Sequence, residues 1–263
     1  MSLRIYICCK QVPDVAMPFQ IKEGQLIKDG LNYILNAYDA SSVEEALVLK
    51  AEHGAHITLV LIGPDKAKEA LRKGLAMGAD DAVHLNDEAF EGCDSHAAAR
   101  ILAKYFADKE YDFILTGKQS QDMDMGLTGG ILAHHLKIPY VTNAVGLKAD
   151  LGDKKVTVKR QGDDGQEMID IPFPCLVTCS NDMNDPRIPS LKGIMSSKKK
   201  PLEVVALDGL GLDSSEVGSS GSPTSIVSWA EPDKRQAGQK FEGDADELVG
   251  TLMDKLANDA KVI

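Results

Sequence analysis

Short apolar runs alternate with amphipathic stretches through the first 150 residues. The apolar runs have the length and residue types of buried strands. They are RIYICCK (4–10), HITLVLIG (56–63), DAVHLN (81–86), YDFILTG (111–117) and YVTNAVGLKAD (140–150). Strands that are separated by helices pair in parallel and need helices on both faces. The pattern therefore predicts an α/β fold with a parallel, doubly wound sheet.

Capping and stop residues bound the amphipathic stretches between these strands. Ser, Asp and Pro favour helix starts, and Gly favours helix ends. The predicted helices are 39–54 with Asp39 or Ser41 as N-cap and Gly54 as stop, 64–80 with Pro64 first and Gly78 last, 94–110 capped by Asp94 or Ser95, and 125–139 from near Met125 to Pro139. In such sheets, ligands bind beyond the carboxyl ends of strands, where the strand order reverses.

The pattern changes after residue 150. Two segments of period two surround GDDG within 154–171, which predicts a hairpin, and 172–180 reads as a further strand. A proline-punctuated segment comes next, in which Leu191, Ile194 and Met195 are expected to be exposed beside the lysine run 198–200. Residues 208–225 are rich in Gly, Ser and Asp and predict a linker. The last segment predicts an amphipathic helix capped by Asp244.

Composition narrows the classes of function. The formal charge of -11 argues against nucleic acid as a partner, because phosphate backbones require clustered Lys and Arg. The five cysteines are odd in number and scattered, which predicts reduced thiols and a cytoplasmic protein. Cys175 and Cys179 lack the spacing of a zinc pair, and the neighbours His134 and His135 point about 100° apart on a helix, so no metal site is expected. The chain has no apolar run long enough to span a membrane.

The stretch GKQSQDMDMGLTGG (117–130) is the strongest candidate for a binding loop. It follows a buried strand and leads into a helix, whose N-terminal amides favour an anion. Glycines 117, 126, 129 and 130 would let the backbone approach a phosphate. Asp122 and Asp124 would repel that phosphate, so we expect them to cap amides, bind ribose hydroxyls or face water. The stretch matches neither a P-loop nor the G-x-G-x-x-G motif. Its place between a strand end and a helix start, together with its glycines, still predicts a nucleotide site.

Several motifs together carry a resemblance to a known family. They are NAYDASSVEEALVLK (36–50), ALRKGLAMGADDAVHL (70–85), GKQSQDMDMGLTG (117–129) and NDPRIPSLKGIMSSKKKPL (184–202). The last is the most specific, because no simple packing rule demands such a string. Nearly end to end, the chain resembles the β subunit of electron transfer flavoprotein. That resemblance implies a Rossmann-like sheet of the adenine-nucleotide-hydrolase type with a hairpin extension and a C-terminal helical arm.

The resemblance also implies a function and partners. The family is a heterodimer of an α and a β subunit that accepts electrons from dehydrogenases, such as acyl-CoA dehydrogenases, and passes them to a quinone-linked or other acceptor. FAD is held mainly by the α subunit, while the β subunit binds AMP or, in flavin-bifurcating members, a second FAD. The β subunit itself performs no bond chemistry. On this basis we expect residues 1–205 to form the nucleotide-binding domain, with a hairpin at 154–180 and a recognition loop at 184–200. Residues 206–263 would be a linker and an arm that packs on the α subunit.

Functional residues are carried over by position from the same resemblance. Arg160 and Gln161 match hairpin positions near the flavin of the α subunit, although an acid is frequent in the family where this chain has Gln161. Leu191, with Ile194 and Met195, would dock on dehydrogenases. The residues expected to contact the nucleotide are Cys8, Asn36, Ala37, Tyr38, Asp39, Ile62, Gly117, Lys118, Gln119, Ser120, Gln121, Asp122, Met123, Asp124, Met125, Gly126, Leu127 and Thr128.

Two alternatives remain open at the level of the sequence. Thr128 and Gly129 match AMP-binding members, but Gly126 and Leu127 replace their Asn-Gln pair, so AMP is favoured and a second FAD is the alternative. A different class is a stand-alone α/β protein that hydrolyses ATP to pyrophosphate or senses nucleotides. Such a protein needs a Mg²⁺ ligand pair, for which Asp122 and Asp124 are the only candidates in the loop.

Overall fold

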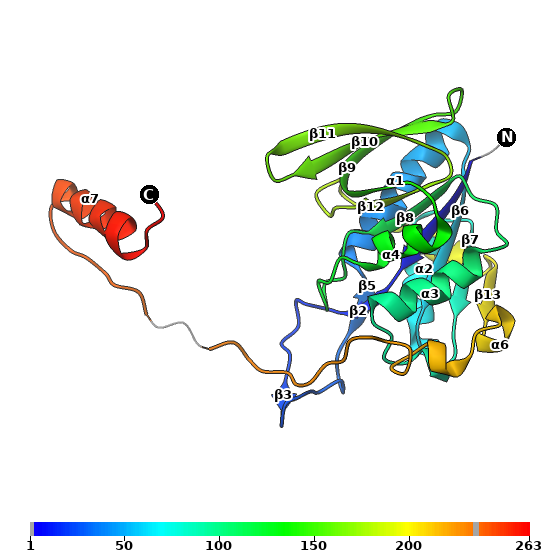
Figure 1. Ribbon diagram of the computed structural model, residues 1–263, viewed down its shortest axis with the longest axis horizontal. Helices are drawn as coiled ribbons and strands as arrows, with labels where there is room; N and C mark the ends of the chain where they lie inside the picture. Colours follow the sequence, from blue (N-terminus) through cyan, green and yellow to red (C-terminus); the bar gives the residue numbers. More distant parts are fainter. Residues whose placement is uncertain (1–2, 234–236) are drawn as a thin grey trace.

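The computed structural model describes residues 3–233 and 237–263 and contains a nine-stranded sheet (Figure 1). Residues 1–2 of the predicted domain and 234–236 of the predicted arm lie outside the described residues. The strand order is β11-β10-β9-β12-β8-β1-β6-β7-β13, and all neighbours from β9 to β13 are parallel. The strands are β1 (Arg4–Cys9), β6 (His56–Ile62), β7 (Asp81–Leu85), β8 (Phe113–Gly117), β9 (Tyr140–Asp150), β10 (Lys155–Gly162), β11 (Gly165–Pro172), β12 (Cys175–Cys179) and β13 (Leu202–Val205).

Helices cover both faces of this sheet, as expected for a doubly wound fold. On one face, α1 (Ala37–His53) and α2 (Lys68–Met77) pack with side chains such as Ile5 and Ile7. On the other face, α3 (Ser95–Phe106) and α4 (Thr128–Leu136) pack with Val60 and Ile114. Each face thus has its own apolar layer, which explains why the parallel strands read as nearly continuous apolar runs. The prediction of a doubly wound α/β fold is confirmed.

The strand order reverses at the centre of the sheet. From β1 the chain adds β6 and β7 on one side, and then crosses to place β8 on the other side of β1. The carboxyl ends of β1 and β8 therefore flank the switch point, where ligands bind in sheets of this type. Gly117 is the last residue of β8, so the loop after it starts at the switch point. Gly63, which comes after β6, lies one strand further out.

Two of the first three helix starts differ from the predictions. Helix α1 begins at Ala37 after Asn36, so Asp39 and Ser41 lie inside the helix instead of capping it. Pro64 precedes the 3-10 helix η1 (Asp65–Ala67), which leads into α2, and is therefore not a first helical residue. The third helix agrees with the prediction, because Asp94 accepts hydrogen bonds from the amides of the first turn of α3. The predicted stops at Gly54 and Gly78 are also confirmed.

Helix α4 begins three residues later than predicted. Asp124 has φ = 50° and Gly126 has φ = 65°, both in the left-handed region. A right-handed helix cannot run through such residues, so it starts only at Thr128. The loop between β8 and α4 consequently spans 118–127, longer than the amphipathic pattern indicated.

Some elements have no counterpart in the prediction. Residues 11–35 contain the short strands β2 (Gln11–Pro13), β3 (Ile21–Lys22), β4 (Gln25–Leu26) and β5 (Tyr33–Leu35). The exposed segment after β12 forms a short helix, α5 (Leu191–Ser197), before the edge strand β13. The predicted linker over 208–225 is wrong in its first part: short helices α6 (Leu207–Leu210) and η3 (Ser214–Glu216) lie there, and both Leu210 and Val217 are buried against the domain. A Gly- and Ser-rich composition concealed these two apolar anchors.

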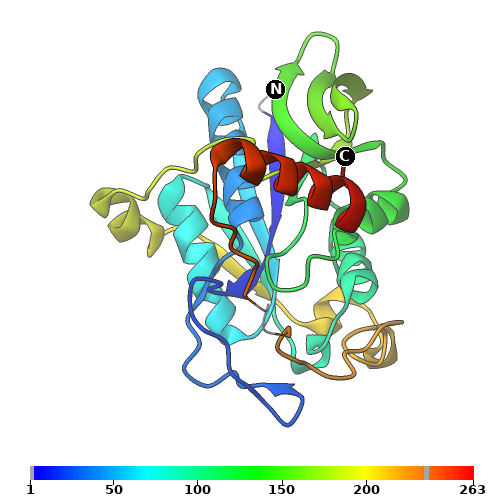
Figure 2. The same cartoon turned by 90° about the vertical axis from the view of Figure 1, so that its left-hand side faces the viewer.

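The C-terminal arm stands apart from the domain in Figure 1. Figure 2 looks along the direction of the arm, so that α7 is drawn in front of the domain. Helix α7 (Ala245–Asp254), capped by Asp244, continues into a π turn (Lys255–Asp259). None of the α7 residues, all of which the structure describes, is buried. Among the described residues, no helix is long and apolar enough to cross a membrane.

Candidate functional site

Asp39 joins the two strands that flank the switch point. One of its carboxylate oxygens, Oδ2, accepts a hydrogen bond from the amide of Lys10 at 2.7 Å, and Oδ1 accepts one from the amide of Gly117 at 3.0 Å. Burial raises the pKa of Asp39 to about 7, against the hydrogen bonds of both amides, which favour the carboxylate. The first turn of α1 therefore anchors the ends of β1 and β8 through one buried side chain.

The glycines of the loop have different structural roles. A Cβ at Gly117 would lie 2.3 Å from Asp39 Oδ1 and 2.7 Å from Tyr38 Cβ, so this glycine makes room for α1. A Cβ at Gly129 would lie 2.7 Å from Thr178 Cγ2, so that glycine lets α4 pack on the sheet. At Gly126 and Gly130 a Cβ would meet other atoms only at 3.5 Å or more. Of the four glycines expected to admit a phosphate, only Gly126 and Gly130 have no tight contact at the Cβ position.

Asn36 and Gln121 hold the loop against the start of α1. The side chain of Asn36 donates to the carbonyl of Gln119 at 2.9 Å and accepts from the amide of Gln121 at 3.1 Å. Gln121 Oε1 in turn accepts from the amide of Ala37 at 3.3 Å. Gln119 Nε2 also lies 3.3 Å from the hydroxyl of Tyr38. The residues carried over from 36–39 and 119–121 thus form one hydrogen-bonded unit that shapes the loop.

Lys10 enters this site without having been expected there. Its ammonium lies 2.8 Å from both carboxylate oxygens of Asp122 and 3.3 Å from Ser120 Oγ. Asp124 accepts a hydrogen bond from Gln119 Nε2 at 2.9 Å. Three roles were expected for these acids: capping amides, binding ribose hydroxyls or facing water. Asp122 forms an ion pair with Lys10, which was not among them. Asp124 is exposed, as the third role requires, and its hydrogen bond to Gln119 supports the loop. Lys10 could have been found from its position in the sequence. It comes directly after the first strand, and the carboxyl ends of parallel strands lie at the same edge of the sheet as the loop.

The start of α4 supplies further backbone donors at the end of the same loop. Leu127 occupies the N-cap position, and no side chain among the described residues caps this helix. The first amides of a helix have no partner inside it, so those of Thr128, Gly129 and Gly130 are available to an anion, whereas the Ile131 amide donates to the Leu127 carbonyl. Met123 and Leu127 are exposed beside them and offer apolar surface for a base. An ammonium, uncapped amides and apolar side chains together suit a nucleotide.

Cys8 and Ile62 lie at the margin of this arrangement. Both are at the carboxyl ends of central strands, but their side chains belong to the apolar layer under α3 and α4. Burial raises the pKa of the Cys8 thiol far above its ordinary value, which leaves it unreactive. Lys118 uses its backbone amide to continue the sheet, donating to the carbonyl of Cys179 at 2.8 Å. His134 and His135 are exposed on α4, as expected for surface histidines.

The hairpin residues form a second region. Arg160 and Gln161 lie near the end of β10, which is three strands away from β8. Arg160 Nη1 pairs with Glu167 Oε2 at 2.7 Å across the hairpin. The carbonyl of Gln161 accepts a hydrogen bond from Asn143 Nδ2 at 2.7 Å. Asn143 is a further residue that the sequence patterns did not single out.

Helix α5 forms a third region on the far side of α2. The side chains of Leu191, Ile194 and Met195 are exposed, the first by 76%. A Cβ at Gly193 would lie 2.4 Å from the carbonyl oxygen of Ala76, so α5 rests directly on the end of α2. The prediction of an exposed apolar group is confirmed, with the difference that it lies on a helix and not on a loop.

An ion pair ties the segment before α5 to α1. Arg187 Nε and Nη2 lie 2.8 and 2.7 Å from the two carboxylate oxygens of Glu44, and the Arg187 amide donates to the same carboxylate at 3.0 Å. These hydrogen bonds lower the pKa of Glu44. This bidentate ion pair holds the segment before α5 in one orientation relative to α1.

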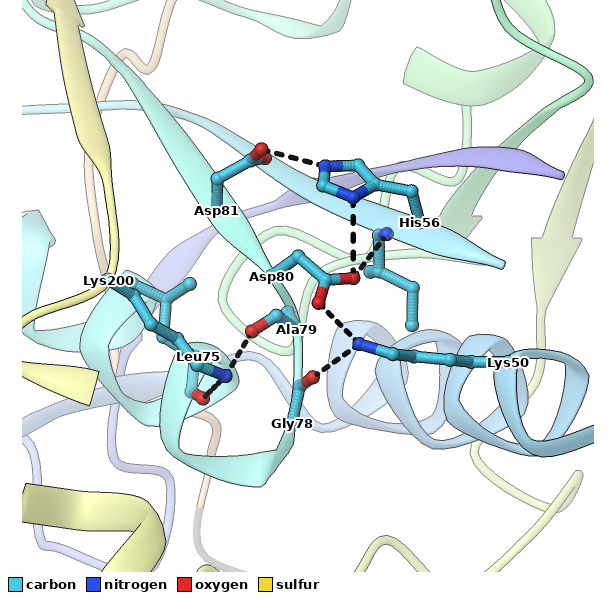
Figure 3. A network of polar contacts seen from close by, with 9 residues as sticks. Lys50, His56, Leu75, Gly78, Ala79, Asp80, Asp81 and Lys200 are labelled. Carbon is cyan, nitrogen blue, oxygen red and sulfur yellow. Dashed lines mark hydrogen bonds and ion pairs between the residues drawn. The ribbon is translucent and has the colours of Figure 1, made fainter. Parts of the chain in front are cut away.

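Lys200 fixes the other end of this region (Figure 3). Its ammonium donates to the carbonyl of Leu75 at 2.9 Å and to that of Ala79, which caps the C-terminal end of α2. Beside it, Lys50 pairs with Asp80 at 2.5 Å, and His56 Nε2 lies 2.8 Å from Asp81 Oδ2 (Figure 3). These groups surround the amino ends of β6 and β7, at the edge opposite the switch point. We therefore assign the network a structural role.

Comparison with known proteins adds to this geometry. A family model described as "Electron transfer flavoprotein domain" matches residues 24–210. The chain is 38% identical over 258 residues to the caffeyl-CoA reductase-Etf complex subunit CarD of Acetobacterium woodii, with 97% of this chain and 98% of that protein covered. It is 36% identical over 256 residues to the electron transfer flavoprotein subunit beta of Thermoanaerobacterium thermosaccharolyticum, with coverage of 97% and 98%. It is 38% identical over 264 residues to the acryloyl-CoA reductase electron transfer subunit gamma of Anaerotignum propionicum, again with 97% and 98% covered.

Proposed function

Because this chain belongs to the electron transfer flavoprotein family as a β subunit, we propose that its role in electron transfer rests on a bound AMP and an FAD-bearing α subunit. The chain holds AMP at the switch point and completes the flavin pocket of the α subunit. It performs no bond chemistry of its own. The observation that carries the proposal is the convergence of Lys10, the uncapped start of α4 and the loop 117–128 at one edge of the sheet.

The residues of the candidate site divide into two groups by their contacts. Asn36, Asp39 and Gln121 are engaged with backbone groups and shape the loop. Lys10 and the amides of Thr128, Gly129 and Gly130 would contact the phosphate. When phosphate binds, it competes with Asp122 for the Lys10 ammonium, and until then the ion pair with Asp122 keeps that ammonium at the site. Met123 and Leu127 then offer apolar contact to adenine.

A second FAD in place of AMP is the other candidate for this site. Two of the relatives are, by name, subunits of CoA reductase systems, one a caffeyl-CoA and one an acryloyl-CoA reductase. This favours a partner enzyme that acts on CoA esters, and it keeps the second-FAD alternative open. The retained Thr128-Gly129 pair favours AMP.

Helix α5 supports the proposal of a dehydrogenase docking surface. Exposed Leu191, Ile194 and Met195 surround Lys192, with Lys198 and Lys199 exposed at the end of the helix. Apolar anchors rimmed by cations suit an acidic surface with an apolar pocket. An acyl-CoA dehydrogenase or a related enzyme would deliver electrons there, and a quinone-linked or other acceptor would receive them. The protein would work in the cytoplasm, where its five cysteines stay free as they are here.

The experiment that tests this function identifies the released nucleotides. The chain is co-expressed with its neighbouring α subunit, purified, denatured and freed of protein. The nucleotides are then separated and read by absorbance at the adenine and flavin maxima. One FAD and one AMP per heterodimer would support the proposal, and two FAD without AMP would favour the second candidate. If the heterodimer held neither and this chain alone hydrolysed ATP with Mg²⁺, the stand-alone enzyme would replace both.

A further inference from the structure

Asn143 has an unusual backbone conformation for a strand residue. Its φ is 58°, in the left-handed region, although it lies within β9 between two hydrogen-bonded neighbours. Asn is among the few residues other than Gly that adopt this conformation readily. Left-handed residues inside elements persist only where the surroundings hold them, and they concentrate at functional positions.

The register of β9 shifts near Asn143 towards both neighbouring strands, β12 and β10. Towards β12, Val177 pairs with Val141 and Cys179 pairs with Ala144, so β9 uses three steps where β12 uses two. Towards β10, Lys159 pairs with Gly146 and Arg160 pairs with Ala144, so β9 again contains one extra residue, Val145, two positions after Asn143. Such bulges bend the strand that carries them and increase its local twist. Here the bulged strand is β9, and its irregularity towards β10 lies opposite Lys159 and Arg160, next to Gln161.

Two hydrogen bonds hold this bulge in place. The amide of Asn143 donates to Thr178 Oγ1 of β12 at 3.0 Å, and Asn143 Nδ2 donates to the carbonyl of Gln161 of β10 at 2.7 Å. Asn143 therefore bridges both neighbouring strands through one residue. Thr178 pairs with Thr116 of β8, one position before Gly117, so the bridge lies at the same edge as the nucleotide loop.

We propose that Asn143 is the positioning residue that directs the Arg160–Gln161 end of the β10–β11 hairpin toward the flavin of the α subunit. The inference rests on the proposed function, because the flavin is the group that this end of the hairpin would face. The left-handed backbone creates the bend, and the side-chain amide holds the Gln161 carbonyl in it. Asn143 itself touches neither flavin nor nucleotide.

Three substitutions at Asn143 distinguish the effect of its left-handed backbone from that of its side-chain hydrogen bond. Asn143→Gly keeps the left-handed conformation and removes the donor. Asn143→Ala removes the donor and also strains the backbone. Asn143→Asp keeps the shape but turns an acceptor toward the Gln161 carbonyl. Asn86→Asp is the matched control, because Asn86 also donates a side-chain hydrogen bond, to Asp65 at 2.9 Å, and comes after β7 on the opposite half of the sheet.

The readout is FAD release from the heterodimer, together with the flavin spectrum and reduction potential. We expect Asn143→Asp and Asn143→Ala to release FAD about five to ten times faster, the factor that one lost hydrogen bond gives, and to shift the potential. Asn143→Gly should show a smaller change, and Asn86→Asp none. The nucleotide of the loop 117–128 should stay at its parental content. Parental FAD release and potential in all three folded variants would overturn the inference.

Hydrogen exchange on the isolated chain tests the same bridge without any flavin. Asn143→Ala and Asn143→Asp should exchange the amides of β10 and β11 faster, while those of α1 and α3 keep their protection. Unchanged protection of the hairpin would overturn the inference even if the flavin changed. A parental heterodimer that contains no FAD would refute the proposed function, and the exchange experiment would still decide the role of Asn143.

Discussion

The carboxylate of Asp39 accepts hydrogen bonds from Lys10 and Gly117 while almost no part of it reaches solvent. At the residue scale, this explains why position 117 is a glycine, which the sequence analysis had attributed to the approach of a phosphate. The carboxylate fills the space that a side chain at position 117 would need. Pattern reasoning recognised that the backbone must approach something closely, but the close neighbour is a residue 78 positions earlier in the chain.

Gly117→Ala tests this role. The added methyl group would lie 2.3 Å from Asp39 Oδ1, and either α1 or β8 must shift. We expect a loss of about 1–3 kcal/mol in the free energy of unfolding, measured with urea on the isolated chain. Gly130→Ala is the control, because its methyl meets only ordinary contacts and helices favour Ala over Gly. Equal effects of the two substitutions would contradict the packing role of Gly117.

The raised pKa of Asp39 predicts a dependence of stability on pH. Its value is about 7 in the folded chain and ~3.9 in an unfolded one. The folded state therefore holds the proton more tightly, and the stability from this group is complete below about pH 4 and lost as the pH rises through about 7. Other carboxyl groups also titrate in this range, so the comparison must be made with Asp39→Asn.

The expected outcome is a difference that changes with pH. The free energy of unfolding of the parent, minus that of Asp39→Asn, should fall by roughly 1–4 kcal/mol between pH 4 and pH 8. Urea unfolding at several pH values measures it. A difference that stays flat over this range would mean that the two amides, and not burial, dominate the pKa of Asp39.

At the scale of elements, the sequence predicts strands better than helix starts. Every apolar run from 4–10 to 140–150 became a strand, because in a parallel sheet burial on both faces leaves a direct trace in composition. Helix starts depend on φ at single residues and on distant partners. The left-handed residues Asp124 and Gly126 prevent α4 from starting before Thr128. Asp39 was predicted as a helix cap because the local sequence pattern does not reveal its hydrogen bonds to the strand ends.

The candidate site divides in the same way. The loop at 117–128 was indicated by two local features, its composition and its place after a strand, and its role as a nucleotide site stays a prediction. Lys10 and Asn143 were not singled out, because their roles depend on which strands become neighbours and on a change of register. The short helix α5 was hidden by the prolines around it, and its exposure was predicted while its structure was not.

Helix α5 also gives a test at this scale. Gly193→Ala would place a methyl group 2.4 Å from the Ala76 carbonyl oxygen and push α5 off the end of α2. We expect it to lower the free energy of unfolding by about 1–3 kcal/mol. Leu191→Ala should leave stability within about 0.5 kcal/mol of the parent, because that side chain is 76% exposed. Urea unfolding of the two variants side by side measures both, and a destabilising Leu191→Ala would contradict a free docking surface.

At the scale of the whole molecule, the domain and the C-terminal arm differ in how they bury apolar side chains. The domain buries two apolar layers against its own sheet, whereas α7 has an apolar stripe and no buried residue among those described. Leu248, Val249, Leu252, Met253 and Leu256 form that stripe at helical spacing. A helix of this length is marginal in water without a packing partner. We therefore expect the arm to pack on the α subunit in the heterodimer.

This argument makes opposite predictions for the isolated chain and the heterodimer. The double substitution Val249→Ser and Leu252→Ser removes apolar area from a stripe that no part of the domain covers, so unfolding of the isolated chain should be unchanged. Binding to the α subunit should weaken by about 10- to 100-fold, as expected for two truncated interface side chains. Titration calorimetry or size-exclusion chromatography at decreasing concentration measures the change. Glu247→Gln, on the opposite side of α7, should bind like the parent. If the double variant binds as tightly as the parent, the stripe does not pack on the α subunit. If it destabilises the isolated chain, the arm packs on its own domain in solution.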